Sequence, residues 1–187
     1  MKNKIFTIPN ILSFFRLALI PFIVWMLLIG QNIVAMILVV LSALTDVVDG
    51  YVARHFNQIT PLGKALDPIA DKLTLLAVLI CTALTNQTVL ALLIIFVVKE
   101  FIMGIEGLVI LKLTGTTYSA LWYGKASTVL LYASLLVHIV WVDILPVVST
   151  VLVSLCNAMV LFSLLMYTIH NVKRIVAIKK QQNQQEV

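Results

Sequence analysis

The sequence predicts an all-α integral membrane protein with six transmembrane helices and both termini in the cytoplasm, and three observations lead to this fold class. Of the 187 residues, 61% are apolar and only 11% are charged, whereas an ordinary soluble domain is about a quarter charged. The mean hydropathy of +1.08 leaves too little polar surface to cover a water-soluble globule. At about 20 apolar residues per bilayer crossing, the chain has room for about six spans. A cytosolic enzyme, a secreted disulfide scaffold and a disordered chain are therefore excluded.

Turn-forming polar clusters divide the long charge-free windows into individual spans. Gly30, Gln31 and Asn32 interrupt the first window, and residues 85–88 interrupt the second. Pro9 suits a first helical turn, whereas Pro21 should kink the first helix. The expected spans are 8–29, 33–54, 63–84, 89–113, 121–142 and 145–170.

The distribution of basic residues predicts the orientation. Lysines and arginines near the span ends all fall on the side that holds both termini, whereas the opposite loops carry only Asp143. By the positive-inside rule, both termini and the 55–62 and 113–121 loops face the cytoplasm, in the cell (inner or plasma) membrane. The net charge of +5 indicates attraction to anionic lipid, and no nucleic-acid partner is expected. We expect one membrane domain over 1–180 and a disordered cytoplasmic tail over 181–187.

Four of the eight acidic residues lie close together in the sequence, at Asp46, Asp49, Asp67 and Asp71. At about 100° per residue, the acids of each span share one helix face with small residues. Those small residues are Gly50 and Ala53 in the second span and Gly63 in the third. A short loop joins the two spans, so we expect the helices to be neighbours and the four carboxylates to converge on one cytoplasmic cavity.

Such a cluster needs compensating positive charge. Each ionised Asp in a span costs roughly 2.5–3.5 kcal/mol on insertion scales, so four cost about 10 kcal/mol before their mutual repulsion is counted. The nearby Arg54, Lys64 and Lys72 cannot easily satisfy all the carboxylate oxygens. Oxygen-rich sites suit Mg²⁺ or Mn²⁺, and four carboxylates are enough for two ions. A pair of divalent ions in turn suits a phosphoryl group.

The acids belong to a longer pattern with fixed spacing, Asp46-x2-Asp49-Gly50-x2-Ala53-Arg54-x8-Gly63-x3-Asp67-x3-Asp71. This pattern resembles the signature of the CDP-alcohol phosphatidyltransferases at all eight specified positions. The amino-terminal segment from Ile8 through Arg16 is similar to that of the same family, and residues 122–125 resemble a later landmark. The likeness covers most of the chain, including its length and six-span plan.

The resemblance implies an enzyme that transfers the phosphatidyl group of CDP-diacylglycerol to an alcohol and releases CMP. It implies that the four aspartates bind two metal ions and that Asp71 also serves as general base toward the acceptor hydroxyl. It places the cytidine nucleotide against Gly50, Ala53, Arg54 and Gly63, with Asn10 and Ser13 as weaker candidates on the nucleotide side. It also suggests a homodimer.

The acceptor alcohol is the least determined part of this prediction. The length and amino-terminal pattern resemble those of phosphatidylglycerophosphate synthases, which use glycerol 3-phosphate, and a phosphate-bearing acceptor needs a basic pocket. Lys99 and Lys125 are the candidates. Members of that type commonly carry an Arg-Glu pair and a second Arg about seven residues further on. Here the pair is Lys99-Glu100, and the stretch that follows, 101–107, contains Glu106 and no Arg. This departure raises the alternative of a cardiolipin-synthase-like transfer to phosphatidylglycerol, and a buried structural ion pair is an equally good interpretation of Lys99-Glu100.

A small ion or proton transporter is the alternative from another functional class, because intramembrane acids also mark ion pathways. Against it, the acids gather at one end of the predicted bundle and form no chain across it. Paired broken helices, typical of many transporters, are not evident in the sequence.

Overall fold

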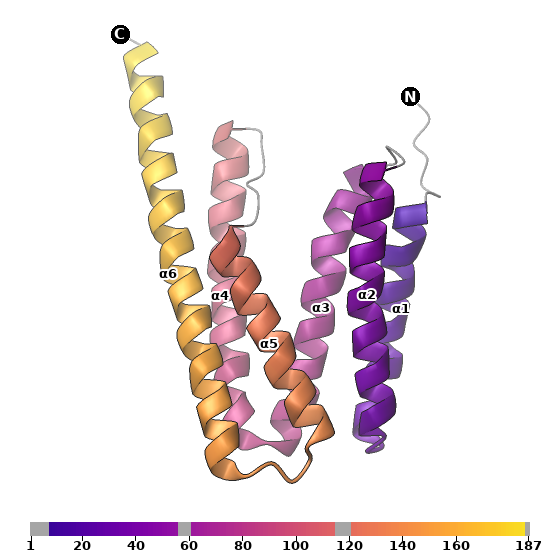
Figure 1. Cartoon of the computed structure of the whole chain (residues 1–187). Helices are drawn as coiled ribbons and strands as arrows, with labels where there is room; N and C mark the ends of the chain where they lie inside the picture. The colour runs from indigo at the N-terminus through magenta and orange to yellow at the C-terminus, as the bar shows by residue number, and fades with distance from the viewer. Residues whose placement is uncertain (1–7, 56–60, 115–120, 186–187) are drawn as a thin grey trace. The chain divides into compact units, whose positions relative to one another are not determined.

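The computed structural model describes residues 8–55, 61–114 and 121–185, with the backbone alone described at 8–9, 46–55, 61–65, 114 and 179–185. These residues form a series of α-helices and connecting turns (Figure 1). In chain order they are α1 (Ile8–Leu28), α2 (Asn32–His55), α3 (Pro61–Thr85), α4 (Gln87–Thr114), α5 (Trp122–Val140) and α6 (Pro146–Gln185). The predicted spans and the observed helices begin and end at nearly the same residues, except at the end of α6.

The helices have the length and surface of membrane spans. Five of them are long and apolar enough to cross a bilayer, whereas the described apolar part of α2 covers only Asn32–Thr45. The six-span count therefore stays a prediction. Large apolar side chains such as Phe22, Phe101 and Trp122 are 54%, 69% and 68% exposed. Such surfaces suit lipid, where the outward face of a helix need not be polar, and identify a membrane protein.

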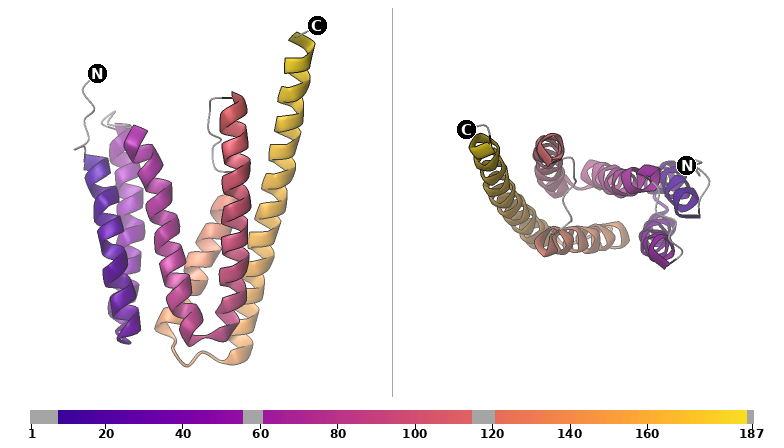
Figure 2. Two further views of the ribbon diagram at one scale, coloured as in Figure 1. Left: turned by 180° about the vertical axis from the view of Figure 1, so that it is seen from behind. Right: turned by 90° about the horizontal axis from the view of Figure 1, so that it is seen from above.

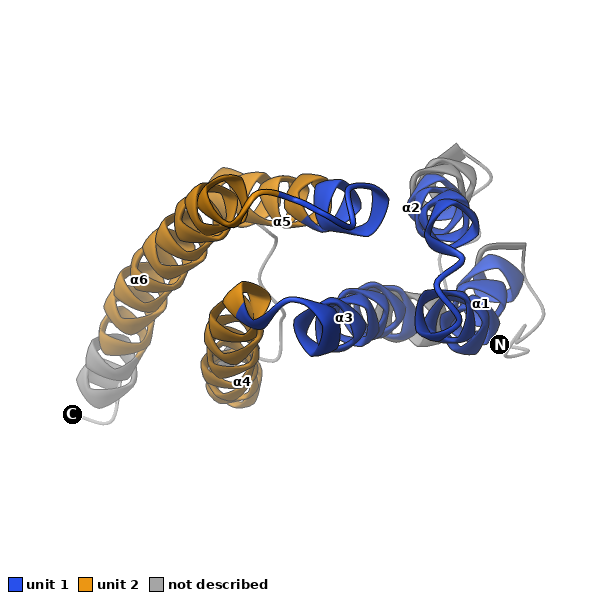
Figure 3. Cartoon of the chain, turned by 90° about the horizontal axis from the view of Figure 1, so that it is seen from below, with its two compact units in different colours: residues 1–87, 135–144 blue, residues 88–134, 145–187 orange. Residues whose placement is uncertain are grey.

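The chain divides into two compact units (Figure 3). Unit 1 comprises residues 1–87 and 135–144, and unit 2 comprises 88–134 and 145–187. Within unit 1, α1 packs along both α2 and α3, whereas α2 and α3 touch each other at only a few points. The views from behind and from above show α1 beside both helices (Figure 2). Helix α1 is therefore the shared neighbour of α2 and α3, the two helices that carry the aspartates.

Local turn chemistry explains how the helices of unit 1 connect. Gly30 has φ +75°, and its amide donates to the carbonyl of Leu27 at 3.2 Å while the amide of Gln31 donates to Met26 at 2.9 Å. This pair of bonds is the Schellman motif, in which the left-handed position is normally glycine. The connection between α3 and α4 is shorter still, because only Asn86 separates them. Both predicted turns are confirmed, and α1 remains one helix through Pro21.

Within unit 2, α6 is the long element. It begins at Pro146, where the missing amide proton costs nothing in a first helical turn, and continues through Gln185. This differs from the expected disordered tail over 181–187, whose last two residues lie outside the described chain. Glutamine has a helix propensity close to that of lysine, so a helix that is already formed can extend into this segment.

Candidate functional site

The two described carboxylates of the predicted site lie on α3. Asp67 and Asp71 are one helical turn apart, so they share a face of the helix. Both side chains are partly buried. Helix α3 begins at Pro61, a residue well suited to the first position of a helix. The sequence-predicted registry on α3 is therefore confirmed, with both acids within the first half of the helix.

A serine on α1 contacts the first of these acids. The Oγ of Ser13 donates a hydrogen bond to Oδ1 of Asp67 at 2.5 Å, across 54 residues of sequence. Ser13 is completely buried, and Asn10 and Arg16 on the same side of α1 are each only 1% exposed. Because these three residues recur at a spacing of three, they form one polar face on an otherwise apolar helix. This face marks the part of α1 that contributes to the site.

The remaining predicted site residues lie at the end of α2 and the start of α3. The backbone is helical through His55 and again from Pro61, so the acids of α2 keep the predicted one-face spacing with Gly50 and Ala53. The side chains that lie outside the described residues are those of Asp46, Asp49, Gly50, Ala53, Arg54 and Gly63. Convergence of all four carboxylates therefore stays a prediction.

The chemistry of the donor set fits a hard divalent cation. A carboxylate offers about four lone-pair positions, so Asp67 can accept a hydrogen bond from the hydroxyl of Ser13 and still coordinate an ion. Mg²⁺ and Mn²⁺ prefer oxygen ligands of this kind. Among the residues with described side chains, no three His, Cys, Asp or Glu form a group that could hold a metal ion.

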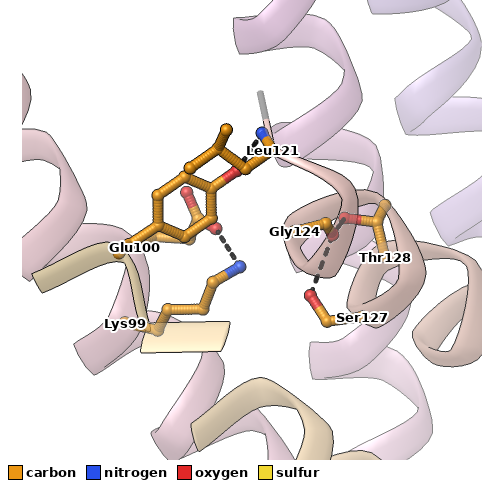
Figure 4. A network of polar contacts seen from close by, with 7 residues as sticks. Lys99, Glu100, Leu121, Gly124, Ser127 and Thr128 are labelled. Atoms are coloured by element: carbon orange, nitrogen blue, oxygen red, sulfur yellow. Dashed lines mark hydrogen bonds and ion pairs between the residues drawn. The ribbon is translucent and has the colours of Figure 1, made fainter. Parts of the chain in front are cut away.

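The two lysines expected near the acceptor lie in unit 2 and have different surroundings. Nζ of Lys99 lies 3.2 Å from Oε1 of Glu100, and the two side chains are 8% and 20% exposed. Figure 4 shows this ion pair. Lys125 lies in the first turn of α5 and is exposed. The buried ion pair considered for Lys99 is confirmed, and Lys125 is the lysine with the more accessible ammonium group.

Glu106 also has a partner within unit 2. The Nδ2 of Asn171 on α6 donates a hydrogen bond to Oε2 of Glu106 on α4 at 2.6 Å. Asn171 is completely buried, so the bond ties the two helices together. Interhelical hydrogen bonds in membrane proteins contribute about 0.6 kcal/mol on average. The carboxylate that argued against an acceptor phosphate thus has a structural role.

The side chain of Tyr167 on α6 contacts the residues at the start of α5. Its phenolic oxygen accepts a hydrogen bond from the amide of Leu121 at 2.8 Å. Its ring meets that of Tyr123 edge to face, with the centroids 4.7 Å apart. A Cβ added at Gly124 would lie 2.4 Å from the Oη of Tyr167. Glycine at this position is therefore what allows α6 to approach the turn that carries Lys125.

We expect Gly124→Ala to destabilise the protein by about 1–3 kcal/mol, the usual cost of overpacking. The new methyl group would displace the buried ring of Tyr167 and weaken its bond to Leu121. The measurement is the melting temperature of the detergent-purified protein. The matched control is Gly104→Ala in α4, where an added Cβ meets nothing within 4 Å. That change should leave the melting temperature equal or higher, because alanine is the better helix former. An equal response of the two variants would contradict this account of Gly124.

Neither Tyr167 nor Asn171 was singled out from the sequence. Tyr167 stands in a long apolar run with nothing to distinguish it from a lipid-facing tyrosine. Asn171 stands at the end of the last charge-free window, and a lone amide there has many possible partners. The only available signal was that a polar residue inside a span needs a hydrogen-bonding partner. This signal does not identify the partner.

Comparison with known proteins shows that most of the chain is similar to one protein family. Residues 6–165 match the family described as CDP-alcohol phosphatidyltransferase. The "CDP-diacylglycerol--glycerol-3-phosphate 3-phosphatidyltransferase" of Aquifex aeolicus is 32% identical over 90% of this chain and 97% of its own length. The protein of the same name from Bacillus subtilis is 32% identical over 71% of this chain and 78% of its own length. A "Cardiolipin synthase (CMP-forming)" of Streptomyces coelicolor is 40% identical, but over 42% of this chain and 39% of its own length.

Proposed function

Because the chain belongs to the CDP-alcohol phosphatidyltransferase family, we propose that it transfers the phosphatidyl group of CDP-diacylglycerol to glycerol 3-phosphate, forming phosphatidylglycerophosphate and CMP. The observation that carries the acceptor is the likeness to the Aquifex enzyme along almost the full length of both chains. The Streptomyces protein, named for cardiolipin synthesis, is similar over less than half of this chain. A transporter is not favoured, since the family consists of transferases.

In this proposal the chain's own side chains bind and orient the two substrates and deprotonate the acceptor hydroxyl. Asp71 accepts the proton of the acceptor hydroxyl as general base. The freed oxygen forms a bond to the phosphorus that carries diacylglycerol, and the bond from that phosphorus to the CMP oxygen breaks, so that CMP leaves with the electron pair. Arg54 and the small residues around it receive the cytidine nucleotide, because short side chains let a ligand approach the helix backbone. Asn10, buried on α1, is a further candidate on the nucleotide side.

The four aspartates would hold two Mg²⁺ or Mn²⁺ ions. The ligands whose side chains the structure describes are Asp71 and Asp67, the latter with its Ser13 partner. The chemistry that such a pair of ions provides is neutralisation of charge on the diphosphate and on the leaving group. The insertion cost of the acids supports the same assignment, because buried carboxylates need cationic partners.

The acceptor phosphate requires a cation outside the carboxylate cluster. We assign this role first to Lys125, whose ammonium group is accessible at the start of α5. Lys99 is a weaker candidate, because Glu100 already pairs with it. Both assignments rest on the need of a phosphate for a basic partner.

The proposed setting is the cell membrane, with the active site facing the cytoplasm and the chain assembled as a homodimer. The one-sided distribution of lysine and arginine supports the orientation. An active site at the cytoplasmic surface reaches a lipid substrate from the side and a soluble acceptor from the water phase.

An acceptor panel tests the proposal. Purified full-length protein with CDP-diacylglycerol and Mn²⁺ is given glycerol 3-phosphate, phosphatidylglycerol, inositol phosphate or serine, and lipid products are separated by thin-layer chromatography. We expect CMP release and a new lipid with glycerol 3-phosphate, and neither in a reaction without acceptor. Product formed only with phosphatidylglycerol would replace the proposed acceptor by the cardiolipin-type one. No CMP release with any acceptor would contradict the enzymatic function itself.

A further inference from the structure

The contact between α1 and α3 joins Asp67, which we place in the carboxylate cluster, to Ser13, a candidate on the nucleotide side. Ser13 is 0% exposed, and its hydroxyl donates to Oδ1 of Asp67 at 2.5 Å. A serine hydroxyl has a single proton to donate, so this bond uses the whole donor capacity of Ser13. Any other ligand of Ser13 could only donate to its oxygen.

Close packing of α1 against α3 does not itself require a hydroxyl. Ala70, one turn along α3 from Asp67, is also completely buried, as is Ala35 of α2. Alanine therefore fills small buried positions elsewhere in unit 1. The hydroxyl of Ser13 adds a directed hydrogen bond to a carboxylate, and bonds of that kind are shorter and stronger than those between neutral groups.

We propose that Ser13 is a positioning residue, which holds the carboxylate of Asp67 in one orientation for a divalent cation. The proposal rests on the proposed function, in which Asp67 is a cation ligand. A carboxylate on its own rotates about its side-chain bonds, and binding an ion then requires that this freedom be lost. The bond from Ser13 removes part of the freedom before the ion arrives. Outer partners of metal ligands typically change metal affinity or activity by about 10–100-fold when removed.

The test is direct Mn²⁺ binding by the purified full-length protein, followed by the electron paramagnetic resonance signal of free Mn²⁺. We expect Ser13→Ala to raise the apparent Kd for Mn²⁺ by about 10–100-fold in a protein that still folds. Ser13→Thr keeps the hydroxyl and should restore most of the affinity. The matched control is Ser163→Ala in α6, which also removes a completely buried hydroxyl and should bind Mn²⁺ like the wild type. In CMP-release assays, the half-saturating Mn²⁺ concentration should shift with the Kd in Ser13→Ala alone.

The outcomes separate this inference from the proposed function. Wild-type protein that neither binds Mn²⁺ nor releases CMP would remove the proposed function. Wild-type protein that does both, while Ser13→Ala binds Mn²⁺ equally well, would overturn the positioning role alone. Equal weakening in Ser163→Ala would overturn it too. If Ser13→Ala does not fold, Ser13→Cys decides, because it nearly keeps the volume but has only a weak donor, and wild-type affinity in that variant would again refute the role.

Discussion

Asp71→Asn is expected to lower kcat by about 100-fold or more, the usual contribution of a positioned general base, while the protein stays folded. Asparagine has nearly the shape of aspartate but cannot accept the proton of the acceptor hydroxyl. Asp71 lies one turn beyond Asp67 on the same face of α3, so the substitution also removes a negative charge from the cluster. The measurement is the initial rate of CMP release at saturating substrates, together with the melting temperature.

The control for Asp71 is Asp143→Asn. Asp143 is an exposed acid in the turn between α5 and α6, so the same chemical change there should leave the rate and the stability unaltered. Turnover at the wild-type rate in Asp71→Asn would refute the general-base assignment. A loss of folding in that variant, with Asp143→Asn intact, would show that Asp71 is needed for the structure and would likewise remove the kinetic evidence for a base.

Removal of divalent ions with EDTA should abolish CMP release, and added Mg²⁺ or Mn²⁺ should restore it. Bound metal ions contribute several kcal/mol of charge stabilisation in phosphoryl transfer, and each 1.36 kcal/mol is tenfold in rate, so we expect a loss of about 1000-fold or more. The all-oxygen set of aspartates is suited to these ions.

A second measurement makes this prediction independent of turnover. An ion that binds only the folded state raises the stability by about 2.7 kcal/mol at 100 times its Kd, so Mn²⁺ should raise the melting temperature of the wild type. The shift should be lost in Asp67→Ala and kept in Asp143→Asn. Full activity after exhaustive chelation, or a Mn²⁺ shift that survives in Asp67→Ala, would argue against the carboxylate metal site.

The helices of this protein could be predicted because their determinants are local. Each apolar run is long enough for a span, and residues such as Gly30 carry turn geometry within a few positions. The face that Asp67 and Asp71 share on α3 could be predicted for the same reason, since a spacing of three or four residues defines a helix face. The metal-binding role of the four aspartates stays a prediction. The tail over 181–187 was predicted less well. Its low-complexity composition does not show whether a helix formed by the preceding residues continues into it, as α6 does through Gln185.

The pairing of helices was not available from the same patterns. In water, an apolar stripe on a helix identifies its buried face, but in lipid both the buried and the outward faces are apolar. The sequence led us to expect α2 and α3 as neighbours; they do touch, but α1 packs more extensively along each of them. The bonds from Ser13 to Asp67 and from Asn171 to Glu106 span 54 and 65 residues, so no local rule connects them.

By itself, the sequence determined the membrane class, the helix boundaries other than the end of α6, the four-aspartate spacing and the family, because each depends on composition or on short fixed offsets. Only the tertiary structure decided which polar groups meet: Ser13 with Asp67, Asn171 with Glu106, and Tyr167 with the turn around Gly124. The physical reason is that buried polar groups in a membrane protein must find partners on other helices. Which partner each one finds depends on how closely the backbones approach, and that is a property of the packed helices as a whole.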